Sequence, residues 1–231
     1  MNRSEASEDQ DQFKTILSRM TREKMQDTVQ PQTVLITLQS IMEFVQDIVE
    51  QLEKSELSLP SACCSGCSYC CHSQIKVIPA EALLIFAFIE KYFDPAQIKA
   101  LKARIQSNRL LVKGKTFKQR VAIKDKTPCI FLINAACSIY AARPLICRSW
   151  HSFDRSACEA AFTSGNHNAE IKTFAARNYM FGIAREVFQD MGDQMDLENG
   201  IYIMPEAIWN CFIPSSPLEN WLLGKQVFHP A

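Results

Sequence analysis

Closely spaced cysteines constrain this chain more than any other feature of its sequence. Five of its ten cysteines fall within nine residues, at Cys63, Cys64, Cys67, Cys70 and Cys71. Gly66 permits the sharp turning that lets several sulfurs converge on one point. A metal requires such convergence, because thiolates bind zinc in a tetrahedron and also hold iron–sulfur clusters. Packing in a core gives no comparable reason to crowd five thiols, so the run predicts a metal site.

Four more cysteines follow at wider intervals, at Cys129, Cys137, Cys147 and Cys158. Their spacing alone says little. Because a metal site needs about four ligands, the two groups together could build one cluster with spare thiols or two tetrahedral sites, and the sequence leaves this choice open. The tenth cysteine, Cys211, lies in the apolar run 208–212 and is expected to be buried and inert.

The compartment decides whether these cysteines are thiols or disulfides. Residues 1–10 are polar and acidic and lack the apolar segment of a secretory signal, which predicts that the protein is not exported. The most apolar stretch, 78–89, contains Pro79 and Glu81 and is shorter than the roughly 20 residues that span a bilayer. We therefore expect a cytoplasmic location, no membrane span and reduced thiols. A secreted protein could instead pair its cysteines as disulfides, which the tandem two-residue gaps disfavour.

Polar side chains beside the cysteines could support a metal. His72 follows the first run and His151 follows the segment 148–150, and both are expected to hydrogen-bond around the site rather than to ligate, because cysteines already exceed one site's needs. Arg143 and Arg148 could pair with acidic side chains or could offset the negative charge of a thiolate-rich centre. Ion pairing is the expectation for these two arginines.

The pattern of apolar residues predicts a mainly α protein, a helical fold around an irregular cysteine-rich metal-binding core with a short β-hairpin. Intervals of three and four predict helices over 13–20, 35–52, 81–92, 94–113 and 168–190. The hairpin is expected from 129–133 and 136–140, with a turn at Asn134 and Ala135. An irregular segment should follow through Cys147, until Asp154 begins a short helix that carries Cys158.

Length and pattern predict three parts in the 231 residues. We expect an N-terminal helical hairpin with a disordered start in 1–56, the cysteine-cluster domain in 57–160, and a C-terminal helical extension packed on the same core in 161–231.

Charge is balanced overall but uneven in one stretch. Lysine and arginine together number 25, as do aspartate and glutamate, so the net charge is zero. The protein as a whole therefore has no electrostatic attraction to nucleic acid or to a membrane. Between Lys99 and Lys126 there are ten basic side chains and one acid. We expect a solvated helix face balanced by the acidic N-terminal helices. The alternative is that this stretch binds an anionic partner, either nucleic acid or an acidic protein; a protein partner could also use the N-terminal helices. Phe117 is the sole aromatic residue of the stretch, which disfavours nucleic acid.

The ordered motifs resemble the YkgJ-type cysteine-cluster family, which is described as a zinc- or iron-chelating domain. They are Cys64-x-x-Cys67-x-x-Cys70-Cys71, Pro128-Cys129-Ile130-Phe131-Leu132, Cys137-Ser138-Ile139-Tyr140 and Arg143-Pro144-Leu145-Ile146-Cys147-Arg148. The resemblance implies as metal ligands Cys64, Cys67, Cys70, Cys71, Cys129, Cys137 and Cys147. Cys63 and Cys158 lie outside the matching motifs and are additional candidates.

Three functions follow from this reading. The first is a metal-binding protein that chelates zinc or iron, with an iron–sulfur centre as the favoured form. The second is a metal-dependent protein-modifying enzyme similar to flagellin lysine-N-methylases, whose cysteine pattern the chain resembles. The third is a structural zinc protein that acts as a binding module. The seven glycines are isolated and form no phosphate-binding loop, which weakens the enzyme alternative.

Overall fold

The computed structural model describes residues 3–25, 30–55, 59–166 and 168–229. As predicted, the fold is mainly helical. Its α-helices are α1 (Arg3–Met25), α2 (Pro31–Lys54), α3 (Pro79–Tyr92), α4 (Pro95–Val112), α5 (Phe117–Val121), α6 (Leu145–Ser149), α7 (Arg155–Ser164), α8 (Ala175–Gln194), α9 (Met204–Cys211) and α10 (Pro217–Leu222). Its strands are β1 (Lys76–Val77), β2 (Leu132–Ile133), β3 (Ala136–Cys137) and β4 (Tyr202–Ile203).

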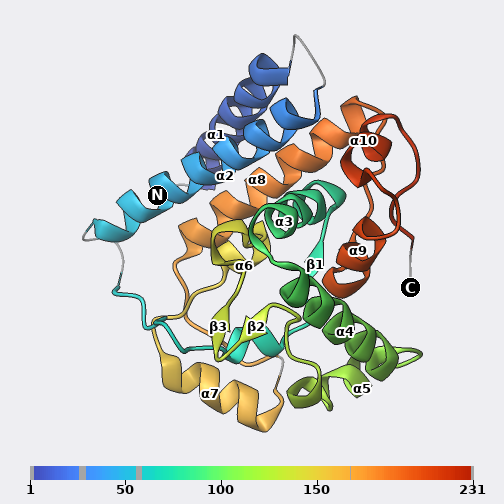
Figure 1. Cartoon of the computed structure of the whole chain (residues 1–231). Coiled ribbons are helices and arrows are strands. Elements are labelled where there is room, and N and C mark those ends of the chain that lie inside the picture. The colour runs from blue at the N-terminus through green and yellow to red at the C-terminus, as the bar shows by residue number, and fades with distance from the viewer. Residues whose placement is uncertain (1–2, 26–29, 56–58, 167, 230–231) are drawn as a thin grey trace.

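Three long helices form one layer of the molecule. Figure 1 shows α1, α2 and α8 side by side, and each of the three contacts the other two. Pro31 begins α2, where its fixed φ suits the first turn. Lys14 of α1 binds Glu186 and Asp190 of α8 at 3.2 and 3.0 Å. The buried apolar residues of α2 face this layer and the core.

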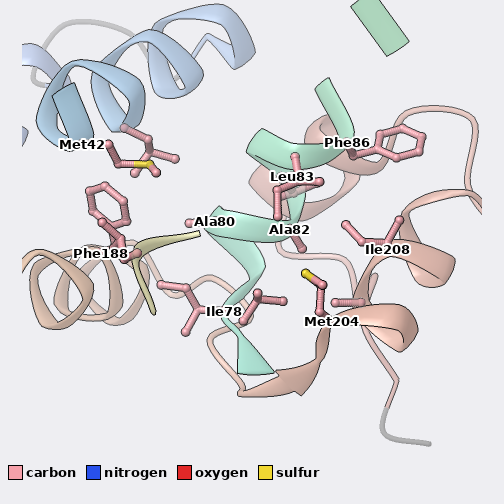
Figure 2. Close-up of a cluster of buried hydrophobic side chains, with 14 of the residues drawn as sticks. Met42, Ile78, Ala80, Ala82, Leu83, Phe86, Phe188, Met204 and Ile208 are labelled. Atoms are coloured by element: carbon pink, nitrogen blue, oxygen red, sulfur yellow. The ribbon is translucent and has the colours of Figure 1, made fainter. Parts of the chain in front are cut away.

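The core is centred on α3. Pro79 begins this helix as expected, and most of its side chains are buried. Figure 2 shows Leu83 and Ala82 of α3 facing Ile208 and Met204 of α9. Phe188 of α8 lies on another side of the same cluster. Buried side chains from both ends of the chain and from the cysteine region join one continuous core.

Two small antiparallel sheets connect distant or irregular segments. In the first, β1 pairs with β4, which ties the segment after the first cysteine run to the C-terminal helices. In the second, β2 pairs with β3 as predicted, although each strand has only two residues. The turn residues Asn134 and Ala135 have φ values of 50° and 58°, the left-handed conformation that two-residue hairpin turns demand.

Two predicted boundaries are wrong. The segment expected to be irregular through Cys147 contains the helix α6, which begins directly after Pro144. The last long helix begins at Ala175 rather than at residue 168. Its start is delayed because the Phe174 amide donates to Nε2 of His151, 2.9 Å away, and Lys172 accepts a backbone bond from Phe153. These tertiary bonds hold the preceding residues out of the helix.

No helix in the described ranges is long and apolar enough to cross a membrane. The three-part division of the chain and the disordered start stay predictions. Met1 and Asn2 lie outside the described residues, and α1 begins at Arg3.

Candidate metal centre

Local turns shape the first cysteine run. The amide of Cys67 donates to the Cys64 carbonyl at 3.0 Å, and the amide of Cys71 donates to the Ser68 carbonyl at 2.9 Å. Gly66 has φ of 85°, a left-handed conformation that favours glycine. A 3₁₀ turn then spans Tyr69–His72. The chain therefore reverses twice within the run, which the two-residue gaps predict.

One backbone hydrogen bond joins the two groups of cysteines. The Cys129 amide donates to the Cys71 carbonyl, with 2.7 Å between nitrogen and oxygen. The hairpin after Cys129 brings in Cys137 on β3, and α6 brings in Cys147. All ten cysteines lie within the described ranges, and each is a free thiol there.

Five thiols affect one another electrostatically, and we call them the inner cysteines: Cys70, Cys71, Cys129, Cys137 and Cys147. A hydrogen bond with the Cys71 thiol, followed by desolvation, raises the pKa of Cys70 although this residue keeps exposed surface. Burial raises the pKa of Cys129 to about 12, and the thiols of Cys137 and Cys70 add to the increase. Burial also raises the pKa of Cys147, with contributions from Cys129, Cys70 and Cys137. Cys70 interacts with each of the other four inner thiols.

The other candidates lie farther out, and we call Cys63, Cys64 and Cys67 the outer cysteines. Cys63 and Cys64 are exposed. Burial raises the pKa of Cys67, and the thiols of Cys63 and Cys70 contribute, so Cys67 links the outer and inner groups. Nη1 of Arg155 on α7 lies 3.8 Å from the Cys64 sulfur.

The two remaining cysteines lie on helices, α7 and α9. Cys158 lies on α7, whose N-terminus Asp154 caps as the sequence predicts. Cys211 is completely buried in the core, and its charged neighbour is Glu90 rather than another cysteine. The prediction that Cys211 is buried is therefore confirmed.

The donor set fits a soft metal ion or an iron–sulfur cluster. As placed, no three cysteine, histidine, aspartate or glutamate side chains in the described part of the chain form a ready metal site. The inner donors are nevertheless all sulfur, and both burial and mutual repulsion disfavour their ionised forms. A bound cation removes both penalties, since metal ligation deprotonates a thiol outright.

The two histidines make contacts outside the inner cysteines. Nδ1 of His72 lies 3.3 Å from the Lys124 carbonyl, and the ring packs on Phe162. Nε2 of His151 accepts the Phe174 amide at 2.9 Å. Burial, with Arg177 nearby, lowers the pKa of His151, which favours the neutral form that this acceptor role needs.

Glu81 positions the helix that carries Cys147. This buried carboxylate accepts the Leu145 amide at the start of α6 at 2.7 Å and the Ile78 amide at 3.0 Å. Nε of Arg185 lies 3.7 Å away. Burial raises the pKa of Glu81. The sequence shows Glu81 only as an interruption of an apolar run, and a lone acid in such a run was the available signal for a buried structural carboxylate.

The two arginines near the cysteines do not form the expected ion pairs. Arg148 donates to the backbone carbonyls of Arg143 and Ala141 at 2.9 and 2.6 Å. The guanidinium of Arg143 lies over the Tyr140 ring, 3.7 Å from its centroid. Neither arginine has a carboxylate within 4.0 Å among the described side chains, so the ion-pair prediction is wrong.

Several basic side chains of the stretch 99–126 contact residues outside the N-terminal helices. Arg109 pairs with Glu206 at 2.7 Å, and Arg104 donates to the Ile130 carbonyl. The ammonium of Lys124 lies over the Phe162 ring. The basic side chains of the stretch 99–126 form no ion pair with the described side chains of α1 and α2. Direct pairing with the N-terminal helices therefore does not balance the charge of this stretch among the described residues.

Comparison with known families supports the metal site. Residues 63–167 match the CxxCxxCC family model, whose description is "Putative zinc- or iron-chelating domain". This match confirms the resemblance seen in the sequence and supports metal binding in general. No curated protein and no solved structure matches the chain significantly.

Proposed function

We propose that this protein binds zinc or iron in the reducing cytoplasm through its inner cysteines, and that the bound form is an iron–sulfur centre. The observation that carries the proposal is the Cys129–Cys71 backbone bond, which joins the two groups of cysteines and leaves the thiol of Cys70 close enough to act electrostatically on the other four inner thiols. Cysteine-only donor sets are the usual ligands of iron–sulfur clusters. Nε2 of His151 is engaged by the backbone amide of Phe174.

Cys64 and Cys67 belong to this proposal as further ligands. The family resemblance includes both, and the Cys70 thiol contributes to the raised pKa of Cys67. Cys63 and Cys158 are additional candidates. These seven thiols exceed the four positions of one tetrahedral site, so the remaining thiols are spare or serve a second site.

Structural zinc is the second candidate, because zinc accepts the same four thiolates. The enzyme alternative gains no support from the cavities of the described residues. A cavity of about 260 Å³ lies between α1 and α8, and no cysteine lines it. A cavity beside Cys129 has about 10 Å³, roughly the space of one water molecule.

The deciding experiment is metal and acid-labile sulfide analysis of protein purified without oxygen, together with a visible absorption spectrum. Iron with sulfide and a brown colour supports the iron–sulfur centre. Stoichiometric zinc without colour replaces it with structural zinc. A full-length protein without either metal contradicts the proposal.

Variants test which thiols hold the metal. Because five inner thiols are available, a spare thiol can replace a single lost ligand. The double variant Cys70→Ser/Cys129→Ser leaves three inner thiols, fewer than the four that a tetrahedral site needs, and should lose most of its metal. Cys211→Ala removes a completely buried thiol outside the site and should keep the wild-type metal content. Equal metal in the double variant and the wild type would remove the inner cysteines from the proposal.

A further inference from the structure

Arg143 is a cation beside the inner cysteines without a counter-charge. Its guanidinium lies over Tyr140 and is close enough to the thiols of Cys70 and Cys137 to act on both electrostatically. Its Nε is buried and has no hydrogen-bond partner within the described residues. No carboxylate of the described chain lies at ion-pair distance. The thiols are therefore the candidates to balance its charge.

A chain of hydrogen bonds fixes the segment that carries Arg143. Arg148 binds the carbonyl of Arg143 at 2.9 Å. Arg177 on α8 in turn binds the carbonyl of Arg148 at 2.6 Å and holds both carboxylate oxygens of Glu53 at 2.6 and 2.7 Å. The backbone that carries Arg143 is thus held in place from α2 and α8, and the guanidinium itself rests on the Tyr140 ring.

A partly buried guanidinium without an anion loses solvation, and the contact with the Tyr140 ring repays only part of this loss. A metal centre with net negative charge would repay it. Four thiolates around Zn²⁺ carry a net charge of about −2, whereas two thiolates with two neutral histidines carry none. The unpaired Arg143 therefore favours a centre built from thiolates alone.

We propose that Arg143 is the positioning residue that balances the charge of an anionic, all-thiolate metal centre at the inner cysteines. This inference rests on the proposed function and adds to it the sign of the centre's charge and the residue that compensates it. Arg143 contacts no metal in this scheme; it stabilises the ionised ligands through their electrostatic field.

The test is the Zn²⁺ affinity of the full-length protein, measured by competition with a chelator of known affinity. Two variants lose the planar group that lies over Tyr140 and differ from each other in charge: Arg143→Met and Arg143→Lys. Arg143→Met should bind Zn²⁺ about 10–100-fold more weakly than the wild type, the range found for groups that support metal ligands. Arg143→Lys should recover most of this loss.

Arg109→Gln is the matched control. Arg109 also lies over an aromatic ring, that of Trp209 at 5.2 Å, but it already has a carboxylate partner in Glu206. Its loss should leave Zn²⁺ affinity unchanged. Co²⁺ provides a spectroscopic check, since the thiolate-to-metal absorption should be the same in the wild type and in both Arg143 variants if the ligands are unchanged.

Equal losses in Arg143→Met and Arg143→Lys, including failure of both to fold, would overturn the inference, because a packing role would then explain both. Wild-type affinity in Arg143→Met would overturn it as well. In either case the wild type still binds metal and the proposed function stands. A wild type that binds no Zn²⁺, Co²⁺ or iron would instead overturn the proposed function together with the inference.

Discussion

The long helices, by which we mean α1, α2, α3 and α8, and the cysteine loop, which comprises residues 59–74, are built by different means. Most side chains of α3 are buried, and α8 also buries much of its length. In the cysteine loop no residue is buried, and α7, which packs against the loop's 3₁₀ turn, has none either. A buried aliphatic side chain contributes about 1.5–3 kcal/mol. The cysteine loop lacks this contribution, so turns, backbone bonds and the proposed metal must hold it.

Two polar clamps join these regions. Glu81 connects α3 to the start of α6, and the Glu53–Arg177 pair connects α2 and α8 to the carbonyl of Arg148. The helices α2, α3 and α8 therefore position the segments that carry Cys147 and Arg143. The comparison suggests that metal loss should loosen one region while the other stays folded.

Metal removal should have the largest effect, and it should be local. Treatment with a chelator should reduce amide-exchange protection of Cys67, Cys71 and Cys129 by at least about 100-fold, since metal binding free energy is folding free energy where little apolar surface is buried. Amides of α3 and α8 should keep their protection. Hydrogen exchange with mass spectrometry measures both. Unchanged protection of the cysteine loop would show that its own hydrogen bonds suffice.

A core substitution should have the reverse pattern. Leu83→Ala removes a side chain that is 2% exposed in the cluster of Figure 2 and should lower the free energy of unfolding by about 2–5 kcal/mol. Leu110→Ala, at a side chain that is 76% exposed, should change it by less than about 0.5 kcal/mol. Urea unfolding measures the two, and metal per folded chain should be the same in both. Metal loss in Leu83→Ala at full folding would mean that the regions are not separable.

The smallest effect concerns the clamp between the regions. Hydrogen bonds from Arg177 lower the pKa of Glu53. Because this pKa is lower in the folded than in the unfolded chain, the stabilisation is complete above the unfolded value of about 4.3 and is lost as pH falls through the folded value. Glu53→Gln should lower stability by about 1–3 kcal/mol at pH 7 and flatten the acid dependence.

Urea unfolding at pH 7 and between pH 5 and 3 tests this expectation. Glu50→Gln is the control, because Glu50 lies on the same helix and bonds only within it, to Gln46. An equally steep loss of stability in acid for Glu53→Gln and the wild type would assign the acid dependence to other carboxylates.

Much of the local structure could be predicted from the sequence. Pro31, Pro79 and Pro95 mark helix starts because their φ suits a first turn, and Asn134–Ala135 marks a hairpin because it separates two short apolar segments. The α6 helix escaped prediction because its first amide is satisfied by Glu81, a residue far away in the chain. The late start of α8 escaped it for the same reason, since His151 holds Phe174.

The sequence by itself determined that the chain is mainly helical, that its cysteines crowd together in a metal-binding pattern, and that Cys211 is a core residue. These properties depend on residue type and on spacing between near neighbours. The tertiary structure decided that a backbone bond joins Cys129 to Cys71, that Arg143 has no carboxylate partner among the described side chains, and that Glu81 accepts the amide at the start of the helix that carries Cys147. These properties depend on hydrogen bonds and packing between residues far apart in the chain, and no local pattern encodes their pairing.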